Sequence, residues 1–327
     1  MSVCSDVARP SSYSRSKKVV QAVFMDQAVR LHEVNQPFRL RLAFATLSRF
    51  LSIETDHPAV AEYVRTAFAR VAARMPLDAA PCDRGGIFCD SPAPRVTFND
   101  QIVEFANSLV LRTAFQAAFH GSSKLFRLSL RSVPEWLSLY GAALSVDGRA
   151  ILISARSGTG KTTLALELMA RGARFLTDEY VCVRKSDRLV SGLPKTLMLR
   201  ERTLPFLSNG KLRTICNDLP ARNTSHGLRV WDFIDVAAVF GDSVLAEPAP
   251  LAHVFVLERS DARLIGAKRI PAAVAAAELV PRVNLNGTGF DRFAEVMSML
   301  AGIPCHRVTA GNPGRTADAV LDIIKQR

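Results

Sequence analysis

A glycine-containing loop between an apolar run and an amphipathic stretch has the residue types needed to bind phosphate. Residues 151–163 read ILISARSGTGKTT, and the amphipathic stretch continues to residue 170. Small residues let backbone N–H groups converge on phosphate oxygens, and the start of a helix adds partial positive charge. Lys161 would reach the β- and γ-phosphates, and the Thr162 hydroxyl would ligate Mg²⁺. The predicted nucleotide-binding residues are Ser157, Gly158, Thr159, Gly160, Lys161, Thr162 and Thr163.

The first position of this loop is Ala155, where the usual pattern has glycine. A methyl group in place of hydrogen matters only if the backbone φ angle there is positive. The alternative interpretation is a plain Gly/Ser turn before a helix. We favour the nucleotide site because a strand, a loop and a helix follow one another in the expected order.

Two adjacent carboxylates, Asp178 and Glu179, lie 17 and 18 positions beyond Lys161. One helix and a tight return fill that spacing, and we predict one strand over 174–183 that continues past the acids. Such a strand would bring both carboxylates back to the phosphate loop. One could support Mg²⁺ while the other accepts a proton from an attacking hydroxyl, a contribution of about 10²–10⁴ in rate. The alternative is that Asp178 only accepts hydrogen bonds from backbone N–H groups.

The residues around the loop predict a mixed sheet with helices, an α/β fold. Asp147 and Gly148 predict a tight turn between strands over 137–146 and 149–154. The polar segment 200–227 has few structural signals, and a connection of that length is often a lid or substrate loop. Further strands are predicted over 192–199, 251–257 and 306–308, and further helices over 271–283, 291–301 and 316–325.

The N-terminal third mixes short strands and helices and contains no catalytic constellation. Strands are predicted over 38–44, 95–98 and 101–105, with Asn99 and Asp100 as a hairpin turn. Helical spacing occurs over 59–73 and 108–119, and residues 124–130 alternate like a strand. We therefore divide the chain into a mobile basic tail (1–18), an α+β region of unknown role (19–135) and a catalytic domain (136–327).

Composition narrows the class of protein. The chain has 327 residues, of which 48% are apolar, and a formal net charge of +12. No run approaches the roughly 18 uncharged apolar residues of a membrane helix, and the N-terminus lacks a secretory signal. The six cysteines form no Cys-x-x-Cys pair, which favours reduced thiols in a cytoplasmic protein. The positive charge is distributed without a nucleic-acid-binding motif, so nucleic acid is a disfavoured partner.

Four segments resemble the C-terminal domain of HPr kinase/phosphorylase: residues 140–144, 157–168, 171–172 and 176–179. They are closer still to the HPr-kinase-related serine kinases of bacteria, some of which phosphorylate ribosomal peptide precursors such as those of lasso peptides. The resemblance covers about residues 137–325 and is strong over 137–183. It implies an ATP-binding domain of the phosphoenolpyruvate-carboxykinase type, with Asp178 at the position of the family's catalytic Asp and Glu179 at that of its second carboxylate. The bifunctional enzymes of the family are hexamers, so the resemblance also admits a homo-oligomer.

The sequence departs from the family pattern at three places. Tyr140-Gly141 stands where the family has His-Gly, and Ala155 replaces the first loop glycine. Residues 198–201, Met-Leu-Arg-Glu, stand where the family has a Glu-Ile-Arg-Gly signature that supports Mg²⁺. These departures argue against the phosphorylase activity and against HPr as the substrate.

Three functions are compatible with these residues. The first is an ATP- and Mg²⁺-dependent kinase for a Ser or Thr hydroxyl of a peptide or small protein. In it Asp178 is the base, Lys161 binds phosphate, Thr162 and Glu179 serve the metal, and Lys195 or Arg200 stabilises the transferred group. The second is a kinase for a small-molecule hydroxyl, and the third is a nucleotide-binding interaction protein without transfer activity.

Overall fold

The computed structural model describes residues 38–44, 49–70, 82–89, 94–105, 113–218, 221–223, 229–259 and 266–326. The predicted basic tail, residues 1–18, lies outside these ranges. The described strands form a five-stranded sheet near the N-terminus, a nine-stranded sheet and a small three-stranded sheet. No helix among the described residues is long and apolar enough to cross a membrane.

The five-stranded sheet has the order β1-β2-β3-β4-β5. The helix α2 (Pro58–Ala67) follows β2, and only the β2–β3 pair is parallel. Asn99 and Asp100 have φ angles of 47° and 66°, which suits a two-residue hairpin turn and confirms the one predicted between β4 and β5. The strands are β1 (Phe38–Phe44), β2 (Arg49–Thr55), β3 (Cys82–Phe88), β4 (Arg95–Phe98) and β5 (Gln101–Ile102).

The predicted strand over 124–130 is wrong, because these residues lie in the helix α4 (Ser122–Arg131). This helix continues from α3 (Ala114–Gln116) through one π-helical turn, Ala117–Gly121. The alternation misled because a polar residue is buried: the Ser129 hydroxyl donates to Asp83 Oδ2 at 2.7 Å. Counted as buried, Ser129 completes a helical face with Ser122, Leu125, Phe126 and Leu130.

The nine-stranded sheet has the order β6-β10-β11-β15-β8-β7-β9, with β17 beside β15 and β16 beside β17. The pairs β8–β15 and β15–β17 are parallel and the others antiparallel, which confirms a mixed α/β fold. The strands are β6 (Trp136–Tyr140), β7 (Ala142–Val146), β8 (Arg149–Ser154), β9 (Arg174–Thr177), β10 (Tyr180–Arg184), β11 (Leu189–Gly192), β15 (Ala249–Arg259), β16 (Ala267–Ile270) and β17 (Cys305–Ala310).

Two predicted single strands are each broken into two. Residues 137–146 break at Gly141, so that β6 pairs with β10 while β7 pairs with β8 and β9. Residues 174–183 break at Asp178 and Glu179, between β9 and β10. The two breaks face each other, because the Gly141 N–H donates to the Glu179 carbonyl at 3.3 Å. A Cβ atom on Gly141 would lie 3.0 Å from the Ile153 carbonyl oxygen, so the close approach there favours glycine.

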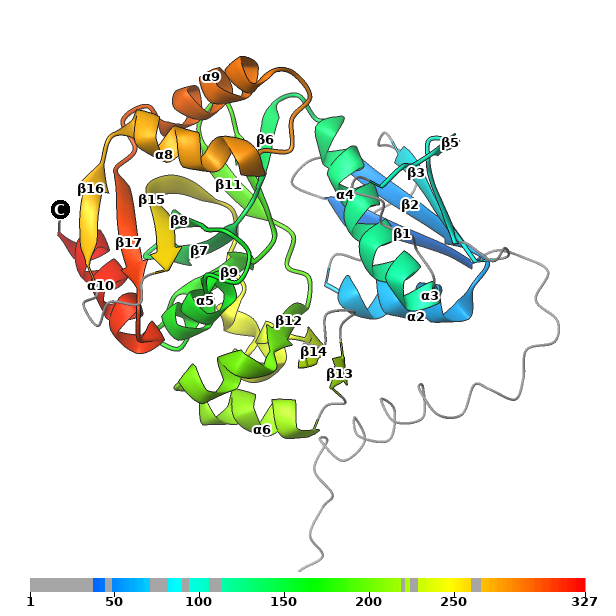
Figure 1. The fold of residues 1–327 in the computed structure, drawn as a ribbon, viewed down its shortest axis with the longest axis horizontal. Helices are drawn as coiled ribbons and strands as arrows, with labels where there is room; N and C mark the ends of the chain where they lie inside the picture. The colour runs from blue at the N-terminus through cyan, green and yellow to red at the C-terminus, as the bar shows by residue number, and fades with distance from the viewer. Residues whose placement is uncertain are drawn as a thin grey trace, which may run out of the picture. The chain divides into compact units, whose positions relative to one another are not determined.

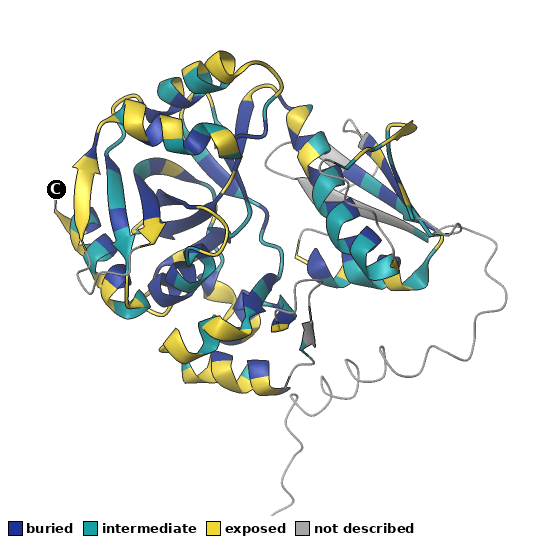
Figure 2. Cartoon of the chain, in the orientation of Figure 1, coloured by how far each residue is buried: buried dark blue, intermediate teal, exposed yellow. Residues whose placement is uncertain are grey.

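Helices cover both faces of the nine-stranded sheet (Figure 1). On one face α5 (Lys161–Met169) and α10 (Pro313–Lys325) pack against residues such as Phe255, and on the other α8 (Ala272–Leu279) and α9 (Gly289–Leu300) pack against Val254 and Val256. A strand buried on both faces reads as a continuous apolar run, as β15 does. Figure 2 shows this burial in the centre of the sheet.

The segment between β11 and β15 differs from its prediction. The strand expected over 192–199 is divided, since β11 ends at Gly192 and β12 (Leu197–Arg200) begins five residues later. The described part of the expected irregular loop contains a 3₁₀ helix (Glu201–Phe206) and α6 (Gly210–Asp218). The remaining elements are β13 (Arg222–Asn223), β14 (Arg229–Ile234), α7 (Val236–Phe240) and two 3₁₀ turns, Asp242–Val244 and Val280–Arg282.

Candidate active site

The phosphate-binding pattern forms the expected strand, loop and helix. The strand β8 ends at Ser154, and α5 begins at Lys161. Gly158 and Gly160 have φ angles of 82° and 114°, a region that side chains disfavour, so both positions require glycine. Ala155 has no such positive φ and is 1% exposed, so a methyl group is accommodated at the position where the usual pattern has glycine.

The side chain of Lys161 is folded into the loop. Its Nζ atom donates to the Ala155 carbonyl at 3.3 Å and lies 4.5 Å from the centre of the Tyr140 ring. The residue is 6% exposed, and this burial lowers the pKa of Lys161 although the nearby carboxylates partly offset it. Arg282 Nε donates to the same Ala155 carbonyl at 3.2 Å. Two cations therefore bind the same carbonyl at the start of the loop.

Asp178 faces the start of α5. The Thr162 hydroxyl donates to Asp178 Oδ2 at 2.5 Å, while Oδ1 is shielded from solvent and has no hydrogen-bond partner among the described residues. Burial raises the pKa of Asp178 to about 7, against the opposing effects of the Thr162 hydrogen bond and the Lys161 charge. A carboxylate that titrates near neutral pH is suited to accept and release a proton.

Glu179 turns away from its neighbour. Its carboxylate forms an ion pair with Lys195, whose ammonium group also lies 5.9 Å and 6.0 Å from the ring centres of Phe68 and Tyr180. The two predicted acids are thus adjacent in the chain but have different partners. Asp178, rather than Glu179, contacts the hydroxyl predicted to ligate the metal.

These groups line one pocket of about 580 Å³. All seven predicted nucleotide-binding residues, both acids, Lys195 and Arg200 belong to its wall. Arg200 Nη2 donates to the Ser157 hydroxyl at 3.4 Å, and a Cβ atom on Gly158 would lie 2.9 Å from Arg202 Nη2. Sequence reasoning did not place Tyr140, Arg202 or Arg259 in the site. The one sequence signal that could have placed Arg202 in the site is its position two residues after Arg200.

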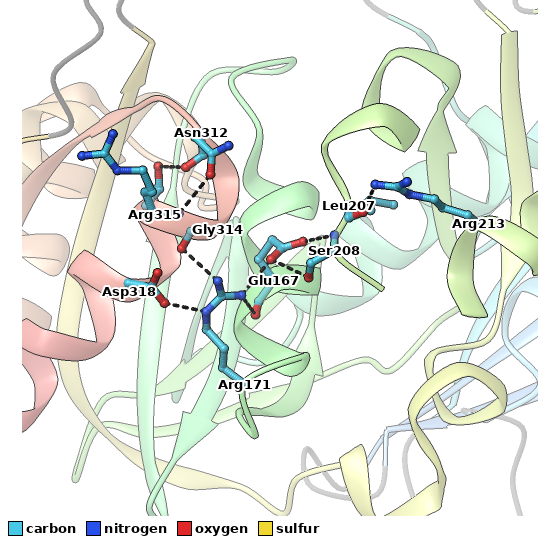
Figure 3. A network of polar contacts seen from close by, with 10 residues as sticks. Glu167, Arg171, Leu207, Ser208, Arg213, Asn312, Gly314, Arg315 and Asp318 are labelled. Carbon is cyan, nitrogen blue, oxygen red and sulfur yellow. Dashed lines mark hydrogen bonds and ion pairs between the residues drawn. The ribbon is translucent and has the colours of Figure 1, made fainter. Parts of the chain in front are cut away.

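A buried carboxylate on α5 anchors the segment that follows Arg200 and Arg202; Figure 3 shows its contacts with Ser208. Glu167, 1% exposed, accepts from the Ser208 N–H at 2.7 Å and from the Ser208 hydroxyl at 2.8 Å, and pairs with Arg171 at 2.7 Å. Arg171 also contacts Asp318 at 2.7 Å and the Gly314 carbonyl at 3.1 Å, both on α10. Burial by itself would raise the pKa of Glu167, but the hydrogen bonds from Ser208 and Arg171 outweigh it and lower the pKa.

The oxygen atoms beside the loop fit Mg²⁺. The Thr162 hydroxyl and the partnerless Asp178 Oδ1 are hard oxygen donors of the kind this ion prefers, whereas the Glu179 carboxylate is already paired. No cluster of three or more His, Cys, Asp or Glu side chains among the described residues could hold a metal ion. Phosphate oxygens and water would complete the coordination, as is usual for Mg²⁺ at nucleotide sites.

Comparisons with known proteins connect this chain to one family by sequence. No family model matches the chain. The HPr kinase/phosphorylase of Clostridium kluyveri is 29% identical over 132 residues, which are 40% of this chain and 35% of the relative. That of Clostridium botulinum is 47% identical over 58 residues, 17% of this chain and 19% of the relative. The matches thus span about a third or less of these curated relatives.

A search of solved structures finds the HPr(Ser) kinase/phosphatase from Coxiella burnetii, with 14% identity and a TM-score of 0.29. That match covers 57% of this chain and 95% of the other. The sequence relatives, and not this structural match, bear out the predicted resemblance: over part of its length the chain is similar to HPr kinase/phosphorylases.

Proposed function

Because the chain is HPr-kinase-like, we propose that it is an ATP-dependent kinase that transfers the γ-phosphate to a Ser or Thr hydroxyl of a peptide or small protein. The observation that supports this most is the 2.5 Å hydrogen bond between Thr162 at the loop and Asp178 beyond it. It puts a carboxylate with a pKa of about 7 next to the residues suited to hold the triphosphate. We also propose the division at residues 135/136, with a domain of the HPr kinase and phosphoenolpyruvate carboxykinase type after it.

Phosphoryl transfer needs the reacting groups to be held in line and their charge to be stabilised. The loop N–H groups and Lys161 bind the β- and γ-phosphates. Asp178 accepts the proton of the acceptor hydroxyl while the oxygen of that hydroxyl bonds to the γ-phosphorus. The bond between the γ-phosphorus and the β,γ-bridging oxygen breaks, which releases ADP. Arg200 and Arg202 stabilise the charge on the transferred group.

Mg²⁺, when bound, would neutralise charge on the β- and γ-phosphates. Thr162 would contribute its hydroxyl oxygen to the ion, which leaves Asp178 Oδ1 to accept the proton of the acceptor hydroxyl. We assign Glu179, through its ion pair with Lys195, to orient water in the metal's outer shell. Lys195 then holds that carboxylate in place and is not itself in contact with phosphate.

One observation favours a second candidate function. Both acids are engaged, Asp178 with Thr162 and Glu179 with Lys195, as expected of a nucleotide-binding interaction protein that never transfers phosphate. A kinase for a small-molecule hydroxyl would occupy the same pocket. Transfer of phosphate to a peptide would distinguish the proposed kinase from both alternatives.

The test is transfer of labelled phosphate from ATP to peptides encoded beside the gene, with nucleotide binding measured in parallel. Asp178→Asn is expected to bind ATP and to lose transfer. Asp187→Asn, which changes an exposed carboxylate paired with Arg184, is the matched control and should retain both. Normal transfer by Asp178→Asn would contradict the proposed base. ATP binding without transfer by the unaltered protein would favour the interaction protein.

A further inference from the structure

A row of cations lies along one face of α4. Lys124, Arg127 and Arg131 are three and four residues apart, a spacing that aligns side chains on one side of a helix. Burial, then Arg127, and then Arg292 on the first turn of α9 lower the pKa of Arg131. We call these four residues the basic stripe.

The basic stripe has no acidic partner among the residues that the structure describes. In the described part of the chain, no carboxylate forms an ion pair with any of the four residues, although Arg65, Arg184 and Arg229 each have one. Burial and then Arg127 and Arg131 lower the pKa of Lys124, and the Nε atom of Arg292 is buried without a hydrogen-bond partner. Unpaired like charges held together repel one another, and an acidic ligand would relieve that repulsion.

The stripe begins beside the candidate active site. The Tyr180 hydroxyl donates to the Ser123 carbonyl at 3.1 Å, and Tyr180 directly follows Glu179 in the chain. Burial raises the pKa of Tyr180, and the positive charge of Arg127 partly opposes that rise. The first cations of the stripe are therefore next to β10, the strand that begins directly after the acid pair.

A second link runs through Asn284. Arg131 Nε donates to Asn284 Oδ1 at 2.8 Å, and Asn284 Nδ2 donates to the Arg127 carbonyl at 2.7 Å and to the Ser138 hydroxyl at 3.2 Å. Ser138 is two residues, or about 7 Å, from Tyr140 along β6 and on the same side of the strand. Tyr140 in turn lies against Lys161. The stripe is thus fixed to the strand that lines the pocket.

We infer that the basic stripe binds an acidic segment of the acceptor peptide or protein, and so directs a nearby hydroxyl to Asp178. This inference rests on the proposed kinase function. It names the substrate class as an acceptor with several Asp or Glu residues close to the phosphorylated Ser or Thr. A nucleic acid is less suited, because Phe126, the aromatic residue of α4, is fully buried and offers no surface for base stacking.

The experiment measures binding and transfer separately. Fluorescent peptides with one serine and a run of glutamates, placed before or after it, are titrated without nucleotide, and phosphate transfer to them is measured with ATP. One glutamate peptide is expected to bind, more weakly as salt is raised. The double variant Lys124→Gln/Arg127→Gln should bind it about tenfold more weakly, since each exposed ion pair contributes roughly a threefold factor.

The matched control removes the same charge elsewhere. Lys268→Gln/Arg269→Gln changes two exposed cations on β16 and should bind the glutamate peptide like the unaltered protein. Arg127→Glu should shift the preference toward a lysine peptide. Binding without transfer would support the surface and overturn the kinase function.

Three results would overturn the inference. The first is the absence of binding to either glutamate peptide. The second is equal binding by the double variant and the unaltered protein. In the third, the double variant still binds the glutamate peptide but no longer binds an RNA oligonucleotide or phosphatidylserine vesicles, which would assign the stripe to those partners.

Discussion

Two carboxylates, one within α5 and one facing its first turn, have opposite environments. Glu167, within α5, accepts hydrogen bonds from Ser208 and Arg171, and these lower its pKa. Asp178, facing the first turn of α5, has one hydrogen bond and one partnerless oxygen, and burial raises its pKa to about 7. The saturated carboxylate supports the fold, whereas the unsaturated one retains capacity for a ligand or proton.

The largest expected effect is on chemistry at Asp178. Asp178→Asn should lower the transfer rate by about 10²–10⁴, the contribution typical of a general base, without lowering the free energy of unfolding. Asparagine can still accept the Thr162 hydrogen bond and removes a poorly solvated charge. Steady-state kinetics and urea denaturation measure the two quantities. A loss of stability as large as that caused by a change at Glu167 would remove the distinction between the two sites.

Glu167→Gln should act mainly on stability. It leaves Arg171 without its buried partner, so the free energy of unfolding should fall by about 1–3 kcal/mol in urea denaturation. Because Ser208 anchors the segment after Arg200 and Arg202, nucleotide affinity should fall by a few-fold as well. Glu62→Gln, which changes the exposed pair with Arg65, is the control and should cost under about 0.5 kcal/mol. Equal effects of the two variants would contradict the anchoring role.

The pH dependence of the free energy of unfolding should reflect the lowered pKa of Glu167. The pKa of Glu167 is lower in the folded protein than its ordinary value of 4.5, so the unfolded chain binds the proton more readily. This contribution to stability is fully present above about pH 4.5 and is lost as the pH falls below it. Unfolding curves between about pH 6 and pH 3.5 should decline less steeply for Glu167→Gln than for the unaltered protein. Parallel declines would contradict the lowered pKa.

The ion pair between Arg171 and Asp318 should contribute least to the free energy of unfolding. Asp318 is 59% exposed, and exposed ion pairs contribute little because water and salt screen them. Asp318→Asn should lower the free energy of unfolding by at most about 0.5 kcal/mol and leave nucleotide affinity unchanged. A cost close to that of Glu167→Gln would mean that α10 is held mainly from its surface.

Sequence patterns predicted elements well where one property repeats along the chain. The strands over 38–44 and 149–154 and the helix that begins at Lys161 were predicted from such patterns. Sequence patterns failed where a single glycine or a buried polar group interrupts the repeat, as at Gly141 and Ser129. The site was accessible to sequence reasoning because the loop and the acid pair are each contiguous. Arg202 and Arg259 were missed because an arginine near a strand end has no local signature that distinguishes it from a solvated one.

The sequence by itself determined the groups that we propose to act on phosphate: a loop with Gly158 and Gly160, Lys161 and Thr162, and a carboxylate one helix further on. These depend on short-range geometry, which neighbouring residues specify. Only the tertiary structure decided that the acids separate, with Asp178 on Thr162 and Glu179 on Lys195. It also decided that Glu167 holds Ser208. Those contacts join residues up to 41 positions apart, and their partners depend on strand register and helix packing that no local pattern encodes.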